Sequence, residues 1–200
     1  MILSLINSIF QHIKFYSLAN LLGKGANVVI FLLIAKVFSV QEFANYVTLM
    51  IAVELAIVIL LFGVDSYIMR AQSSSSFDVT LEFIKFNLLV NFVFSIIIAL
   101  IYSLNYITTY NFLLLLSLNI YLFYRVFEKL FTNYLIRSQQ SKGFMKVTFF
   151  ISYFQLSLIL IAFYFNFLNI TNYFFMLSSA IIILIFFIFI KFRNEKIYSL

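Results

Sequence analysis

Residues 147–190 read VTFFISYFQLSLILIAFYFNFLNITNYFFMLSSAIIILIFFIFI and contain no charged side chain. A helix that crosses the hydrocarbon core of a bilayer needs about 20 apolar residues, so this stretch is long enough for two such helices. Asparagines gather within residues 166–172 and predict a tight polar turn between the two helices. We therefore expect membrane spans near residues 147–167 and 172–190.

Further apolar stretches of similar length precede this hairpin, near residues 17–38, 43–64, 84–104 and 111–136. Hydrophobic residues make up 64% of the chain, charged residues only 10%, and the mean hydropathy is +1.10. A soluble domain carries about 25% charged residues, so water is not the main solvent of this chain. The sequence predicts an all-α, polytopic membrane protein in which residues 1–200 form a single bundle of six transmembrane helices.

The positions of the basic residues predict the orientation of this bundle. With six spans, Lys36 lies toward one side of the membrane, and most other cations lie on the side of the two termini. The cations on that side are Lys14, Arg70, Lys85, Arg137, Lys142, Lys146, Lys191, Arg193 and Lys196. Because cytoplasmic loops carry the excess of Lys and Arg, we expect both termini in the cytoplasm. Topology, rather than a nucleic acid partner, then explains the net charge of +6.

Missing residue types narrow the chemistry. The chain has no cysteine and one histidine, His12, so disulfides and thiol catalysis are excluded, and no metal site or cofactor is expected.

The chain has no proline and only four glycines, which favours continuous helices. Residues 1–13 predict an interfacial lead-in rather than a signal peptide, and the serine run 73–76 predicts a flexible tether. Without tryptophan, interfacial anchoring is expected from Tyr102, Tyr106, Tyr110 and Tyr173.

Polar and charged side chains recur at helical spacing inside three predicted spans. Ionisable groups at membrane depth are costly and usually face a bundle interior or a water-filled cavity. The second span carries Glu54 near its middle, with no clear facing. The first span has a stripe formed by Ser17, Asn20, Lys24 and Asn27. The fourth span has a polar face with Lys129 at its edge, formed by Ser117, Tyr121, Arg125, Glu128 and Thr132.

Two interpretations of these charges compete. In one, Lys24–Glu54 and Arg125–Glu128 are ion pairs that only hold helices together. In the other, which we favour, the polar faces line a hydrophilic cavity with a net positive balance that binds an anion. The cavity interpretation assigns anion binding to Lys24, Arg125 and Lys129. It leaves four polar or coupling candidates in the same cavity, namely Asn20, Asn27, Glu54 and Glu128.

Residues 17–70 read SLANLLGKGANVVIFLLIAKVFSVQEFANYVTLMIAVELAIVILLFGVDSYIMR. This stretch resembles the N-terminus of polysaccharide-export flippases (O-antigen flippases, Wzx-like) of the multidrug/oligosaccharidyl-lipid/polysaccharide exporter superfamily. Three pieces carry the resemblance: the small and polar first helix with Lys24, the turn Ser39-Val40-Gln41-Glu42-Phe43, and Phe62-Gly63-Val64-Asp65 leading to Arg70. The last three predicted spans resemble the family only in topology.

The resemblance implies a transporter of the bacterial inner membrane. Such proteins move a polyprenyl-diphosphate-linked oligosaccharide between leaflets during biosynthesis of O-antigen lipopolysaccharide, capsule or exopolysaccharide. The resemblance places Lys24 best among cations that meet the diphosphate, with Arg125 next and Lys129 last. A complete flippase has two six-helix lobes and about twice this many residues. This chain therefore looks like one lobe, which is expected to be a fragment, a half-transporter that needs a second lobe as partner, or a lobe that forms a homodimer.

Three alternatives remain open at this level. A multidrug or cation antiporter of the same superfamily would favour acidic residues in its cavity. A non-transporting lobe or accessory protein of a glycan export complex would need no working cavity. A membrane enzyme would need carboxylates or histidines gathered at the interface, which the predicted loops do not offer, so we expect no enzymatic activity.

Overall fold

The structure, a computed structural model, describes residues 2–61, 63–70, 73–103, 112–138 and 140–198. In these residues the chain is all-helical, as the sequence predicts. The helices are α1 (Ile2–Val37), α2 (Val40–Leu61), α3 (Val64–Arg70), α4 (Ser73–Ser103), α5 (Phe112–Arg137), α6 (Ser141–Tyr164), α7 (Ile170–Ser179) and α8 (Ile181–Tyr198).

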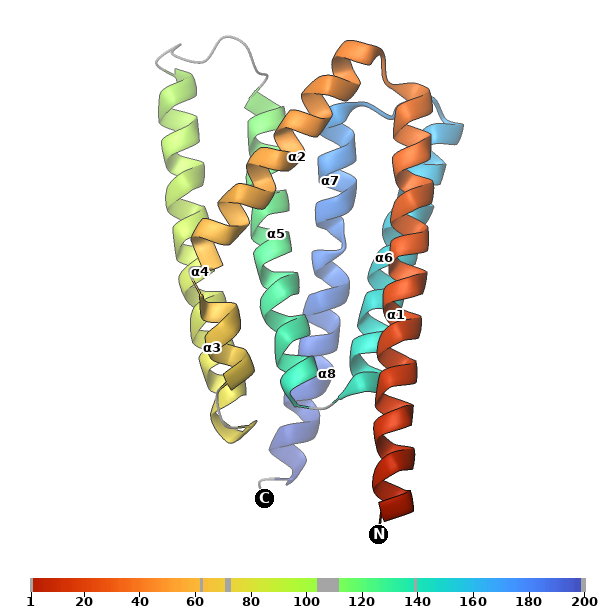
Figure 1. The fold of residues 1–200 in the computed structure, drawn as a ribbon. Helices are drawn as coiled ribbons and strands as arrows, with labels where there is room; N and C mark the ends of the chain where they lie inside the picture. Colours follow the sequence, from red (N-terminus) through yellow and green to blue (C-terminus); the bar gives the residue numbers. More distant parts are fainter. Residues whose placement is uncertain (1, 62, 71–72, 104–111, 139, 199–200) are drawn as a thin grey trace.

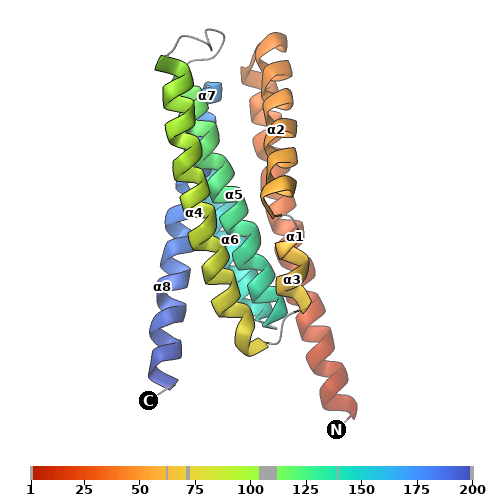
Figure 2. The same cartoon turned by 90° about the vertical axis from the view of Figure 1, so that its left-hand side faces the viewer.

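The helices run up and down between two ends of an elongated bundle (Figure 1). α1 leads away from the end that holds both termini, and α2 with α3 returns to it. α4 and α6 lead away again, while α5 and the α7–α8 pair return (Figure 2). α5 is the central element, because it packs against α2, α3, α4, α6, α7 and α8.

Among the described residues, four segments are long and apolar enough to cross a membrane, namely Ile13–Val37, Val40–Leu61, Ser141–Tyr164 and Ile170–Ile188. They correspond to the first, second, fifth and sixth predicted spans. α5 does not qualify by composition, since Arg125, Glu128 and Lys129 lie within little more than one turn. For α4, the described side chains include the charged Glu82 and Lys85 near its beginning, and those of residues 97–104 lie outside the described set.

α1 packs closely on α6 because small side chains line its inner face. Ala19, Gly23 and Ala26 are buried there, followed by Ile30 and Ile34 at the same helical spacing. A Cβ placed on Gly23 would lie 3.1 Å from Thr148 Cγ2 and 3.3 Å from Ser152 Oγ. Small residues at such intervals let two helix backbones approach in a membrane, where packing rather than hydrophobicity drives association.

α4 and α5 are joined by a cluster of polar side chains that the sequence analysis does not single out. Asn91 Nδ2 donates to the backbone oxygen of Asn119 at 2.9 Å and to Asn119 Oδ1 at 3.0 Å. Asn119 Nδ2 donates in turn to Ser95 Oγ and to the Asn91 backbone oxygen. We call Asn91, Ser95 and Asn119 the asparagine cluster. The side-chain donors of all three members bond within the cluster.

The short connections begin helices in the way the sequence suggests. Ser39 and Glu42 form a capping box, since Ser39 N and Oγ both donate to Glu42 Oε2 at 2.9 Å. Asn169 caps α7, where its Oδ1 accepts from Asn172 N at 2.8 Å. The predicted turn at residues 166–172 is therefore confirmed within residues 165–169. The predicted turn at residues 105–111 lies outside the described residues.

The expectation of continuous helices is wrong at two places. Gly63 has a φ of 80° between α2 and α3, a conformation that suits glycine. Between α7 and α8 the break at Ala180 involves neither glycine nor proline. There Gln155 Nε2 donates to the Leu177 backbone oxygen at 2.9 Å, and the Ser178 and Ser179 hydroxyls donate back to their own helix. Such side-chain bonds compete with the helical ladder and loosen it.

Two other expectations concern the local structure of residues 2–13 and 73–76. Residues 2–13 continue α1 as regular helix ahead of the membrane-capable segment that begins at Ile13, and their predicted interfacial position stays a prediction. The serine run 73–76 is the first turn of α4 rather than a tether. Serine is favoured at helix beginnings, where its hydroxyl can meet unpaired backbone groups.

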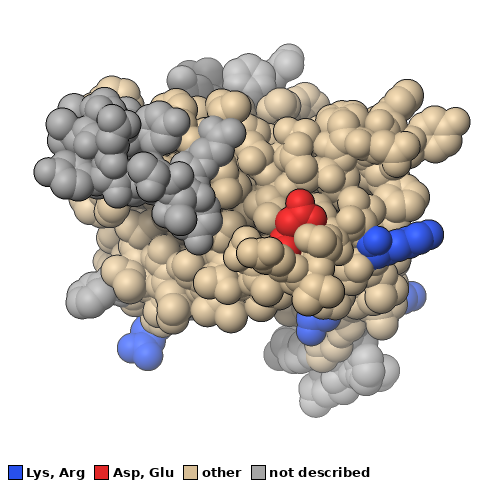
Figure 3. All heavy atoms as spheres, turned by 90° about the horizontal axis from the view of Figure 1, so that it is seen from above, with Lys and Arg blue, Asp and Glu red and all other residues tan. Residues whose placement is uncertain are grey.

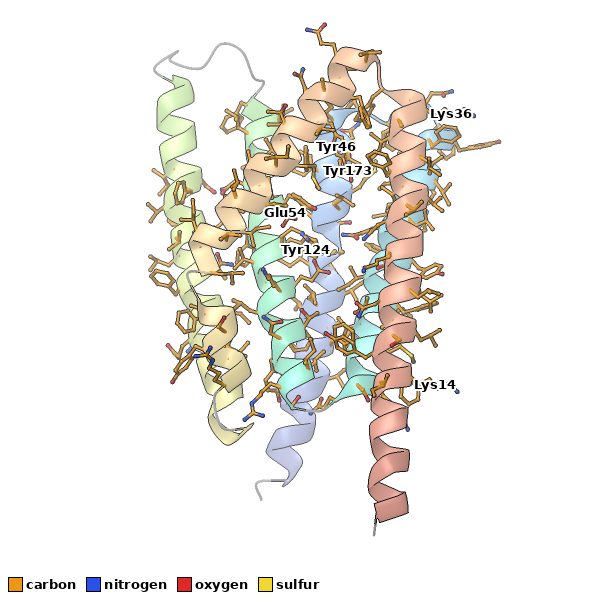
Figure 4. The ribbon with its side chains drawn as sticks, in the orientation of Figure 1. Lys14, Lys36, Tyr46, Glu54, Tyr124 and Tyr173 are labelled. Carbon is orange, nitrogen blue, oxygen red and sulfur yellow. The ribbon has the colours of Figure 1, made fainter. Side chains whose placement is uncertain are left out.

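Charged side chains are unevenly distributed between the two ends. Viewed from the end away from the termini, the described surface is mostly uncharged (Figure 3). Lys36 lies near that end and Lys14 near the other (Figure 4). The end of the termini also receives Arg70 and Arg137, which lie in the last turns of α3 and α5.

Candidate functional site

A cavity of about 280 Å³ lies between α1, α2, α5, α6 and α7. We call it the first cavity. Arg125 and Glu128 give it charge, and the rest of its polar lining is neutral. Its lining residues are Asn27, Ile30, Phe31, Tyr46, Met50, Tyr121, Tyr124, Arg125, Glu128, Ile151, Ser152, Gln155, Tyr173 and Leu177.

Three charged side chains from two helices meet at this cavity and form what we call the charge cluster. Arg125 Nη1 donates to Glu128 Oε2 at 2.7 Å, and Arg125 Nη2 donates to Glu54 Oε1 at 3.2 Å. The Arg125–Glu128 ion pair is therefore confirmed. The side chains of Arg125, Glu54 and Glu128 are 35%, 53% and 19% exposed, so the cluster borders open space.

The predicted Lys24–Glu54 ion pair is wrong, because Glu54 pairs with Arg125 instead. The reason lies in helix packing. α2 buries Val53, Ile57 and Leu61 and packs against α5. Glu54 is thereby directed to the polar face of α5, which settles the facing that the sequence leaves open.

A second cavity of about 280 Å³ also borders the charge cluster. It is lined by Glu54, Ile57, Arg125, Glu128, Lys129 and Thr132. Lys129 is exposed in this cavity, on the edge of the α5 polar face. Arg125 and Glu128 of the charge cluster thus contribute to the walls of both cavities.

The polar stripe of α1 contributes to the site only in part. Asn27 is exposed and lines the first cavity. Lys24 lies one turn earlier on the same stripe and is exposed, but it lines neither cavity described here. Asn20 is partly exposed, a further turn away. Within the described part of the chain no ion pair includes Lys24.

Four tyrosines, which the sequence analysis does not assign to the site as a group, line the neutral part of the first cavity. They are Tyr46, Tyr121, Tyr124 and Tyr173, and we call them the tyrosine pocket. Tyr46 and Tyr173 face each other between α2 and α7, with their hydroxyl oxygens 3.3 Å apart (Figure 4). Tyr173 is only 3% exposed, so its predicted role as an interfacial anchor is wrong. The other three predicted anchors lie outside the described side chains.

One sequence signal did point to this pocket. Tyr121 belongs to the predicted polar face of α5, and Tyr124 lies beside Arg125 in sequence. Tyr46, Tyr173 and Gln155 come from other helices and carry no periodic polar signal of their own. Gln155 is buried and donates through Nε2 to the Tyr124 hydroxyl at 3.0 Å.

Arg125 retains capacity to bind an oxygen ligand. A guanidinium has five N–H donors, and the two bonds to glutamates use two of them. The Nε–H of Arg125 is buried and meets no acceptor among the described residues. Among those residues, no group of three or more His, Cys, Asp or Glu side chains is placed to hold a metal ion. The hydrogen bonds and ion pairs of Arg125 are the interactions that the described side chains offer a ligand at this site.

Comparison with protein-family models, with curated proteins and with solved structures finds no match to this chain.

Proposed function

We propose that this chain is one lobe of a translocator that moves polyprenyl-diphosphate-linked oligosaccharides across the inner membrane of a bacterium. The observation that carries the proposal is the position of Arg125. Its guanidinium lies on the central helix, borders two open cavities and keeps unused donors. Arginine binds phosphate oxygens through several parallel hydrogen bonds, and its charge persists at any physiological pH.

The proposal includes a six-span topology in which α4 and α5 also cross the bilayer. α5 is tolerated there because other helices surround it and its charged side chains turn toward protein and cavity. The termini lie on the cytoplasmic side, since cations such as Arg70 and Arg137 gather at that end. A second lobe, or a second copy of the chain, covers the open side of the cavities.

Lys24 and Lys129 are assigned supporting roles. Lys129 lines the second cavity and is placed to meet a phosphate that leaves Arg125. Lys24 lies on the α1 stripe, one turn from Asn27, and is placed to meet an anion that approaches the first cavity. As point charges, both attract an anion without fixing its orientation.

A complementation assay tests the proposal. The chain is expressed alone, and together with the polypeptide encoded downstream of it, in a bacterium that lacks its own O-antigen flippase. Surface glycan is then compared between the unchanged chain, Arg125→Gln, and Lys36→Gln as a matched cation outside the cavities. We expect export to be restored with the unchanged chain and Lys36→Gln, and lost with Arg125→Gln. Absence of export in every case, with the protein verified in the membrane, contradicts the proposal.

A multidrug or cation antiporter is the second candidate, and a specific observation favours it. Two carboxylates, Glu54 and Glu128, accompany the single guanidinium of the charge cluster, so the cluster as a whole is not positive. An acidic balance suits a cationic substrate. Efflux of ethidium that depends on Glu54 and Glu128, without any effect on surface glycan, supports this candidate over the first.

A further inference from the structure

The first cavity has two chemically different parts. The charge cluster borders one part, while the polar lining of the other is uncharged and comes from α2, α5, α6 and α7. This second part is the tyrosine pocket together with Gln155. In Figure 4 the paired Tyr46 and Tyr173 lie closer than Glu54 to the end that holds Lys36, whereas Tyr124 lies farther from that end than Glu54.

The tyrosine pocket holds more hydrogen-bonding capacity than its own members use. The hydroxyls of Tyr46 and Tyr173 share one hydrogen bond, so one of their two hydrogens has no acceptor in the pair. The hydroxyl of Tyr121, whose side chain is 4% exposed, makes no hydrogen bond to the described residues. Gln155 donates to the Tyr124 hydroxyl and the Leu177 backbone oxygen through Nε2, which leaves its own Oε1 as an acceptor.

This unused capacity distinguishes the pocket from a contact that only holds helices together. In the asparagine cluster, each side-chain amide nitrogen donates hydrogen bonds to the neighbouring helix. Buried polar groups in proteins are otherwise almost always paired, so the donors and acceptors of the tyrosine pocket are expected to meet water or a ligand.

The occupant that fits best is a neutral ring rich in hydroxyl groups. Its hydroxyls both donate and accept, as the phenols and the Gln155 oxygen require. The tyrosine and glutamine side chains are neutral while Arg125 lines the same cavity, so the lining suits an uncharged ring attached to an anionic group, and aromatic rings suit the apolar faces of a sugar ring. The cavity volume of about 280 Å³ is near the lower limit of roughly 300–1,000 Å³ for small-molecule sites, which fits one ring rather than a chain of them.

We propose that the tyrosine pocket is a subsite for a single pyranose ring whose attached phosphate binds Arg125 in the same cavity. The inference rests on the proposed function and adds to it a division of labour. Arg125 binds the phosphate whatever sugar is attached, and the tyrosine hydroxyls select the sugar through hydrogen bonds to its hydroxyl groups. The sugar ring adjacent to the lipid phosphate is therefore the part of the substrate that this lobe selects.

Calorimetric titration of the purified chain in lipid nanodiscs tests the subsite. The probes are glucose, galactose and N-acetylglucosamine, their 1-phosphates, and inorganic phosphate. We expect at least one sugar 1-phosphate to bind about tenfold or more tightly than both inorganic phosphate and the free sugar. Free sugars that bind as tightly as their 1-phosphates would indicate a site for a free sugar and overturn the link to Arg125.

Tyr121→Phe is the most informative variant, because it removes a hydroxyl that makes no hydrogen bond to the described residues and so leaves the folded chain intact. It should abolish most of the excess affinity for the sugar 1-phosphate and leave affinity for inorganic phosphate unchanged. Tyr173→Phe is a second variant with the same expectation. Tyr164→Phe is the matched control, since Tyr164 is 79% exposed and lies outside the cavity.

The outcomes separate this inference from the proposed function. If no sugar 1-phosphate binds more tightly than inorganic phosphate, or if the excess survives in Tyr121→Phe and Tyr173→Phe, the sugar subsite is overturned. Restored export in the complementation assay would then still support the proposed function. An excess affinity that disappears in both variants supports the subsite even when the chain alone does not restore export.

Discussion

Two polar clusters on α5 differ in what they leave unused. The asparagine cluster lies on the side of α5 that packs against α4, and its amide nitrogens donate hydrogen bonds to other members of the cluster. The charge cluster begins with Arg125, six residues or about 9 Å farther along the same helix, on the side that faces α2 and the cavities. There the buried Nε–H of Arg125 has no acceptor among the described residues, and the side chains of Arg125 and Glu54 are both more than one-third exposed.

This difference separates structure from function within one helix. A polar contact that is closed on itself can only hold helices together. A polar contact that borders a cavity and keeps donors unused can also bind something. The four predictions below test this distinction, beginning with the largest expected effect.

The largest effect is expected in the reactivity of introduced cysteines. The chain has no native cysteine, so Asn27→Cys, Ser95→Cys and Leu89→Cys can be compared directly. Asn27 is exposed in the first cavity, Ser95 belongs to the asparagine cluster, and Leu89 is exposed on α4. A charged, water-soluble thiol reagent should modify the Asn27→Cys variant about 100-fold faster than the other two, because the reactive thiolate forms readily only in water.

Leu89→Cys serves as the control for exposure to lipid rather than to water. Comparable rates at positions 27 and 89 would show that the first cavity is filled by lipid, and the contrast between the two clusters would fail. Fast modification at position 95 would show instead that the asparagine cluster is open to water. The measurement is the rate constant of modification in membranes, followed by mass shift on a gel.

The second effect concerns affinity for a lipid diphosphate. Arg125→Gln should weaken binding of farnesyl diphosphate to the chain in nanodiscs by about 30-fold, since loss of one partner of a charge-assisted contact costs about 2 kcal/mol or more. Lys36→Gln, at the opposite end from Lys14 and outside the cavities, should leave affinity unchanged (Figure 4). Unchanged affinity in Arg125→Gln would assign the charge cluster to helix packing alone.

Much of this contrast could be predicted from the sequence, and the remainder depends on packing. The polar face of α5 and the Arg125–Glu128 pair follow from helical spacing, because residues three apart are neighbours on one helix. The partner of Glu54 depends on which helix α2 packs against, and spacing along one helix contains no such information. Likewise the break at Ala180 arises from a glutamine on another helix, without a local glycine or proline signal.

Tyr173 shows the same limit for the tyrosine pocket. At a predicted helix end, a tyrosine is typical of the membrane interface. Its burial against Tyr46 is decided by the crossing of α2 over α7, which brings together residues far apart in the chain. The sequence thus predicts helices and their polar faces better than it predicts which faces meet.

The third effect is on stability and should be found at the asparagine cluster. Asn119→Ala removes the amide that bonds both Asn91 and Ser95. Interhelical hydrogen bonds in membranes contribute about 0.6–2 kcal/mol, so we expect a destabilisation of about 1 kcal/mol in reversible detergent unfolding. Affinity for farnesyl diphosphate should not change. Ser157→Ala is the control, since its hydroxyl bonds only within α6 at an exposed position. A loss of affinity in Asn119→Ala would mean that the two clusters are not independent.

The smallest effect separates the two glutamates of the charge cluster. Glu54 is 53% exposed at 3.2 Å from Arg125, whereas Glu128 is 19% exposed at 2.7 Å. Exposed ion pairs contribute little, about 0–1 kcal/mol, so Glu54→Gln should leave stability almost unchanged. By removing a carboxylate that competes for the guanidinium, it should raise affinity for farnesyl diphosphate about two- to threefold. Glu128→Gln should raise affinity further and lower stability more, because the pair that it removes is shorter and less exposed. Equal effects of the two substitutions on affinity and stability would show that the exposure of a glutamate does not determine how strongly it competes with the ligand for Arg125.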